Sequence, residues 1–74
     1  MNPEKIIKKA MMTNTAITFI YEAKTGELTQ RTVEVKKILA GRFVGYCYLR
    51  KGERIFKMDN VLSIQLKKRA ETGS

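Results

Sequence analysis

The stretch "FVGYCYLRKGERIFKM", residues 43–58, decides the fold. Two runs rich in β-branched and aromatic residues flank a short polar segment that contains Gly52. This is the pattern of a β-hairpin, because such side chains favour strands and glycine favours tight turns. We therefore predict two antiparallel strands, at about residues 42–49 and 53–58.

The turn of this hairpin determines its register. A two-residue loop would force a positive φ on Lys51, which lysine avoids, so we predict a three-residue loop with Gly52 in the left-handed position. Tyr48 then lies opposite Arg54, and facing residues share a side of the sheet. The predicted core side of the hairpin carries Val44, Tyr46, Tyr48, Arg54, Phe56 and Met58.

The residues before the hairpin change from a helical to a strand period. Asn2 and Pro3 suit the start of a helix, and apolar residues at helical spacing follow, so we predict a helix at about 3–12. After Thr13 the sequence alternates. Three further strands are expected, near 15–22, 29–38 and 61–67.

One helix followed by five short strands predicts a mainly β domain. Short turns between the strands favour a small, strongly bent antiparallel barrel. The alternative is an open five-stranded sheet with the helix on one face. We expect residues 1–74 to form a single domain that ends in a polar tail at 68–74, because the chain has only 74 residues.

The side chains available limit the chemistry. The chain has no histidine and a single cysteine, Cys47, so neither a metal cluster nor an internal disulfide is expected. Cys47 lies in mid-strand with no evident base beside it, and the acidic residues show no paired spacing, so we expect neither an enzyme nor a cofactor.

The charge balance favours anionic partners. Fifteen Lys and Arg residues against seven Asp and Glu residues give a net charge of +8. Such a charge on a small domain attracts nucleic acid, nucleotides or acidic proteins, although it also lies at the upper edge of what solubility alone requires. No signal peptide and no run long enough to cross a membrane are evident, so a cytoplasmic protein without membrane contact is expected.

In the predicted register, Tyr48 and Arg54 lie together at the polar end of the core side. A phenol and a guanidinium so placed can hold an anion or stack on a base. The alternative is that Arg54 pairs with Glu53 or Glu27 and that Tyr48 only covers the core.

The sequence resembles the WYL domain family over about residues 15–67. The family's tyrosine-cysteine pair, its "LR" and its "R-x-F-R-L-D-R-I" segment match Tyr46, Cys47, Leu49, Arg50, Arg54, Phe56, Lys57, Met58, Asp59 and Val61. Its upstream strand pair matches Phe19, Tyr21, Arg31 and Val33. The chain departs from the family where Gly41-Arg42-Phe43 replaces the Trp-Tyr-Leu tripeptide, and where Lys57 and Asn60 replace arginines.

The resemblance implies an Sm-like (SH3-type) five-stranded barrel with a ligand-sensing role. Family members act in transcription factors, often in DNA damage or phage defence, and bind single-stranded nucleic acid or a nucleotide-like ligand. This chain would be a stand-alone version without a DNA-binding segment. The residues expected to bind the ligand are Arg31, Arg42, Tyr48, Arg50, Arg54 and Lys57.

A second class of function is left open by the sequence. A small barrel with free sheet edges can pair strand to strand, so the chain could instead be a protein-interaction or oligomerisation module, as a homo-oligomer or with a partner regulator chain. A steep loss of oligonucleotide affinity with rising salt would separate the two.

Overall fold

The computed structural model describes residues 3–48 and 50–67. Its elements differ by two residues at most from the ranges that the sequence predicts. They are α1 (Pro3–Thr13), β1 (Ala16–Glu22), β2 (Leu28–Leu39), β3 (Arg42–Cys47), β4 (Gly52–Lys57), a 3₁₀ turn (Met58–Asn60) and β5 (Val61–Leu66).

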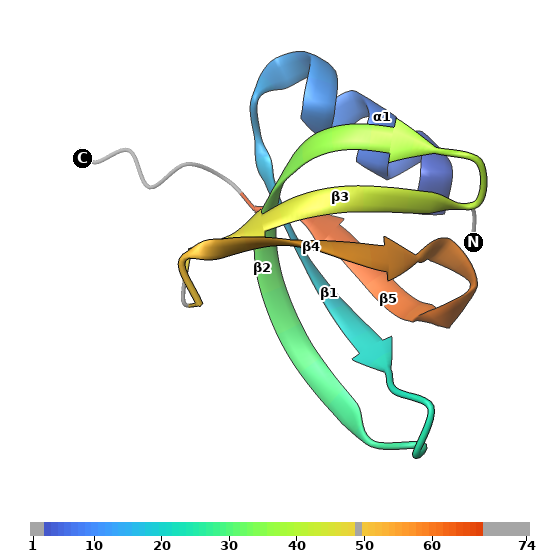
Figure 1. Cartoon of the computed structure of the whole chain (residues 1–74). Helices are drawn as coiled ribbons and strands as arrows, with labels where there is room; N and C mark the ends of the chain where they lie inside the picture. Colours follow the sequence, from blue (N-terminus) through green and yellow to red (C-terminus); the bar gives the residue numbers. More distant parts are fainter. Residues whose placement is uncertain (1–2, 49, 68–74) are drawn as a thin grey trace.

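The five strands form one antiparallel sheet in the order β4-β3-β2-β1-β5. The sheet is strongly curved, and α1 packs against one end of it (Figure 1). The predicted class, mainly β with one N-terminal helix, is confirmed. However, β4 and β5 are the two edge strands, and no ladder joins them within the described residues, so the sheet is not closed into a barrel.

Strand β2 is the longest strand, with twelve residues, and it belongs to two ladders. All of β1 pairs with it, from Ala16 opposite Glu34 to Glu22 opposite Leu28. Strand β3 pairs only with its second half, beginning where Cys47 lies opposite Val33. The first half of β2 therefore projects beyond β3, as Figure 1 shows.

Aromatic rings fill the concave side of the sheet. Phe19 meets Phe43 and Phe56 at ring-centroid distances of 5.6 and 5.2 Å, and Tyr21 lies 5.2 Å from Phe56. Edge-to-face contacts of this kind stabilise a core beyond the area that they bury. Tyr21 also accepts a hydrogen bond from the backbone N–H of Lys57, which ties β1 to the end of β4.

Helix α1 covers one end of this core with the stripe expected from its spacing. Ile7 and Ala10 are fully buried. The helix ends where the Thr13 hydroxyl donates to the Lys9 carbonyl and the Thr15 N–H donates to the Ala10 carbonyl. Asn14 takes a positive φ of 54°, which asparagine tolerates better than most residues, and this turns the chain into β1.

The predicted register of the β3–β4 hairpin is wrong. Phe43 lies opposite Phe56, and Gly45, not Tyr48, lies opposite Arg54. The last pair of the ladder is Cys47 with Gly52. Strand β3 therefore ends before Tyr48, and the part of the prediction that concerns Leu49 lies outside the described residues.

Burial explains why the turn prediction failed. Lys51 has the positive φ, 55°, that was expected at Gly52. A left-handed residue other than glycine costs about 1–2 kcal/mol. Burying a phenylalanine contributes about 1.5–3 kcal/mol, and this register buries Phe43 and Phe56 together. The free energy gained by burying the two rings thus exceeds the cost of the positive φ at Lys51. In this register Tyr46 lies on the outer side of the sheet, not in the core.

Gly45 leaves room for the side chain of Val33 on the core side of the sheet. A Cβ atom at this position would lie 2.6 Å from Cγ2 and 3.0 Å from Cβ of Val33, both buried and stiff. We predict that Gly45→Ala lowers the free energy of unfolding by roughly 1–3 kcal/mol, the usual cost of overpacking a core. Urea denaturation followed by circular dichroism measures the change.

Gly52→Ala is the matched control, because the nearest atom to a Cβ there, outside its chain neighbours, is 3.9 Å away and Gly52 has no positive φ. This variant should be at least as stable as the unmodified protein. Equal stability of the two variants would contradict the tight packing of Val33 against Gly45.

Candidate nucleotide-binding groove

The projecting half of β2 forms one wall of an open groove of about 700 Å³. This volume lies in the range of small-molecule sites. The opposite wall comes from the β3–β4 turn, because β3 ends at Cys47 while β2 continues for five residues toward Leu28. The groove is lined by Thr29, Gln30, Arg31, Thr32, Cys47, Tyr48, Arg50 and Lys67.

Three cations line this groove, and they come from three parts of the chain. Arg31 lies on β2, Arg50 in the β3–β4 turn and Lys67 directly after β5. The Arg31 Nε–H donates to the hydroxyl of Thr29 at 3.3 Å, which limits its orientation. Among the described lining residues none carries a carboxylate, so the groove suits an anion.

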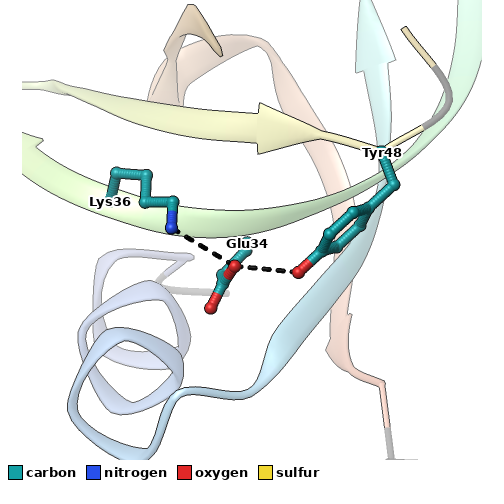
Figure 2. A network of polar contacts seen from close by, with 3 residues as sticks. All are labelled: Glu34, Lys36 and Tyr48. Atoms are coloured by element: carbon teal, nitrogen blue, oxygen red, sulfur yellow. Dashed lines mark hydrogen bonds and ion pairs between the residues drawn. The ribbon is translucent and has the colours of Figure 1, made fainter. Parts of the chain in front are cut away.

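Tyr48 lies where the groove meets the outer side of the sheet, and a polar network holds it there (Figure 2). Its hydroxyl donates to Oε1 of Glu34 at 2.8 Å, and Nζ of Lys36 lies 3.4 Å from the same oxygen. Tyr48 as a whole is 55% exposed, so it remains available to a ligand.

This network shifts two pKa values. The hydrogen bond from Tyr48 is the main reason that the pKa of Glu34 lies below its ordinary value, and the hydrogen bond from Lys36 adds to it. The same hydrogen bond to Glu34 is the main reason that the pKa of Tyr48 is raised. Tyr48 therefore keeps its proton at neutral pH and remains a donor.

A second tyrosine continues this network on the outer side of the sheet. The rings of Tyr46 and Tyr48 meet edge to face at 5.3 Å. Nζ of Lys36 lies 6.0 Å from the centroid of Tyr46, at the limit of a cation–π contact. Lys36 thus links Glu34 with Tyr46, and Glu34 in turn holds Tyr48.

The structure divides the six predicted site residues into separate groups. Arg31, Tyr48 and Arg50 line the groove together. Arg42 and Lys57 lie opposite each other at the far end of the β3–β4 hairpin. Arg54 lies opposite Gly45, away from Tyr48, and no ion pair joins it to Glu53 or Glu27 within residues 3–48 and 50–67.

Lys67 and Glu34 are the residues that sequence reasoning missed. Lys67 was predicted only as the last residue of a strand, yet it lines the groove, and its N–H donates to the Ala16 carbonyl at 2.8 Å and so extends the β1–β5 ladder. Glu34 looked like an ordinary exposed residue of an alternating strand. In the observed register Glu34 lies opposite Tyr46. A correct prediction of the β2–β3 pairing would therefore have indicated that it is close to the tyrosines.

Within residues 3–48 and 50–67, no group of three or more His, Cys, Asp or Glu residues is placed to hold a metal ion. No helix in this part of the chain is long and apolar enough to cross a membrane.

The curved five-stranded sheet and the N-terminal helix define a small, mainly β domain, and one side of it carries a basic groove. The chain matches the WYL domain family over residues 5–66 and belongs to that family. Its function class is accordingly that of a regulatory, ligand-sensing module.

One solved structure similar to the chain is proteasome accessory factor B/C (PafBC) of Arthrobacter aurescens, with a TM-score of 0.82 and 25% sequence identity. The match covers 96% of this chain but only 12% of that protein. No curated protein matches the chain significantly.

The hydrogen bond between Tyr48 and Glu34 has a measurable consequence. We predict that Tyr48→Phe raises the pKa of Glu34 toward the ordinary carboxyl value, because the donor that favours the carboxylate is removed. A ¹³C NMR titration of the side-chain carboxyl carbon measures this. Since the folded pKa is depressed, the network stabilises the fold above the ordinary pKa of glutamate, and this contribution is lost as the pH falls through the lowered value.

Glu27 provides the reference carboxyl signal in the same experiment, because it is exposed and none of the hydrogen bonds of the described residues joins it to Tyr48. The substitution should leave this reference signal unchanged. An unchanged pKa of Glu34 in the Tyr48→Phe protein would show that this hydrogen bond does not hold Tyr48 in solution.

Proposed function

We propose that the groove binds single-stranded nucleic acid or a nucleotide-like anion, and that this binding is the signal that the module senses. The observation that carries the proposal is the convergence of Arg31, Arg50 and Lys67 beside the exposed ring of Tyr48. Cations attract phosphates, and an aromatic face stacks on a base. A groove with both features suits a ligand that is flat at one end and anionic at the other.

The groove residues divide into three roles: phosphate contacts, stacking, and hydrogen bonds to sugar or base edges. The guanidinium groups of Arg31 and Arg50 can each form paired hydrogen bonds with phosphate oxygens, whereas Lys67 acts as a point charge. Tyr48 supplies the stacking surface, and Glu34 keeps its hydroxyl engaged so that the ring stays at the rim. The threonine and glutamine side chains on β2 can hydrogen-bond sugar or base edges.

Membership of the WYL family supports a sensing role for this groove. By analogy with the similar structure, a proteasome accessory factor, we propose that the module regulates a partner regulator chain or a larger assembly. A cytoplasmic setting in transcription control or phage defence follows from the family resemblance and belongs to the same proposal.

A protein-interaction module is the second candidate, and the sheet edges favour it. Edge strand β4 carries charged residues such as Glu53 and Arg54. The other edge strand, β5 (Val61–Leu66), contains no charged residue and exposes Leu62. Charges on an edge strand discourage pairing with another chain, so β5 is the edge open to strand addition.

Binding of labelled single-stranded and double-stranded oligonucleotides, followed by fluorescence anisotropy at two salt concentrations, tests the proposal. We expect single strands to be preferred and affinity to fall as salt rises. Arg31→Ala and Arg50→Ala should each weaken binding by about tenfold, which corresponds to roughly 1.4 kcal/mol. Each should also reduce the salt slope by about one unit.

Lys5→Ala is the matched control, because Lys5 is an exposed cation on α1 and does not line the groove. If Lys5→Ala weakens binding as much as the groove variants do, the binding reflects net charge and the groove is not the site. If the unmodified protein binds no oligonucleotide at low salt, the interaction module replaces this proposal.

A further inference from the structure

Strand β3 presents a row of side chains to the outer side of the sheet. Phe43 and Cys47 point into the core, so the alternate residues Arg42, Val44 and Tyr46 point outward. Tyr48 follows at the end of the strand and also lines the groove. The row therefore begins at the groove and runs along the whole of β3.

The neighbouring strands add cations and apolar surface to this row. Arg42 and Lys57 face each other at its far end, and Ile55, which is 60% exposed, lies opposite Val44. On the other side, Lys36 of β2 lies over the ring of Tyr46. A solvent-facing surface that combines aromatic rings, exposed apolar side chains and spaced cations is typical of sheets that bind single strands.

We infer, on the basis of the function proposed above, that the ligand is a single strand of several nucleotides that leaves the groove over Tyr48 and crosses the outer face of β3 along Tyr46 toward Arg42. The six residue steps from Arg42 to Tyr48 span roughly 20 Å at about 3.4 Å per residue. A mononucleotide would fill the groove alone and leave this surface unused. Sites that bind single strands take about four nucleotides or more.

The charges around Tyr46 fix the side on which the phosphates lie. Glu34 is already engaged by Tyr48 and Lys36, and Lys36 offsets its charge. Glu53 lies directly opposite Tyr46 on β4, and no ion pair within the described residues offsets it. Phosphates therefore lie on the β2 side of Tyr46, near Lys36, and the carboxylate of Glu53 weakens the binding of a long strand.

The test compares two labelled oligothymidylates, of three and of twelve nucleotides, by fluorescence anisotropy at one salt concentration. The quantity measured is the dissociation constant of the three-nucleotide strand divided by that of the twelve-nucleotide strand. A longer strand offers more positions to a short site, so part of this ratio is statistical and remains in every variant. Tyr46→Ala should reduce the ratio by about tenfold, because a stack on an aromatic ring is lost.

Glu53→Lys should raise the ratio. Unlike Tyr46→Ala, this substitution does not remove a half-buried ring, so its result does not depend on packing. We expect it to tighten binding of the twelve-nucleotide strand severalfold and to change binding of the three-nucleotide strand little. Lys36→Glu should reduce the ratio, whereas Lys5→Glu, an equal change of charge on α1, should affect both strands alike. Thermal unfolding of each variant verifies the fold.

Three outcomes overturn the inference. A ratio that Tyr46→Ala and Glu53→Lys leave unchanged shows that the strand does not cross the outer face, while three-nucleotide binding still supports the groove. Tighter binding of polyglutamate than of oligothymidylate shows that the face binds an acidic peptide. If the unmodified protein binds neither strand, the function proposed for the groove is wrong as well.

Discussion

The structure depends on one strand that serves two purposes. The second half of β2 pairs with β3 and carries Val33 and Val35 into the core, whereas its first half pairs only with β1 and forms the wall of the groove. A register shift between Val35 and Lys37 follows the point where the Val33 side chain packs over Gly45. Because β3 ends opposite Val33, the extent of the core also determines where the groove begins.

The polar network shows how this strand connects the site to the fold. Alternate residues of β2 face opposite sides, so Arg31 lies on the side of Phe19 while Glu34 faces outward beside Tyr46. Glu34 then holds Tyr48 at the rim between groove and outer face. A ligand that contacts both Arg31 and Tyr48 would thus reach both ends of the short segment 31–34. It would contact Arg31 directly and Glu34 through Tyr48.

Much of the fold could be predicted from the sequence, because local signals and core demands agree along most of the chain. The change of period after Thr13 located the helix and the strands. Local signals and core packing disagree at one turn. There the local preference favoured a positive φ at Gly52, whereas the pairing of Phe43 with Phe56 places the positive φ on Lys51. A shift of register moved Tyr46 from the predicted core to the surface and separated Tyr48 from Arg54. The site could be predicted only as a set of residue types, because its assembly depends on that register.

The most direct test of this account is an ¹H–¹⁵N NMR titration of the protein with a short single-stranded oligonucleotide. The largest shift changes should occur at the backbone amides of Thr29–Thr32 and of Tyr48 and Arg50, with saturation at one common affinity. Amides of α1 should remain where they are. Changes confined to β5 or to α1, with the β2 amides unmoved, would contradict the assignment of the groove as the binding site.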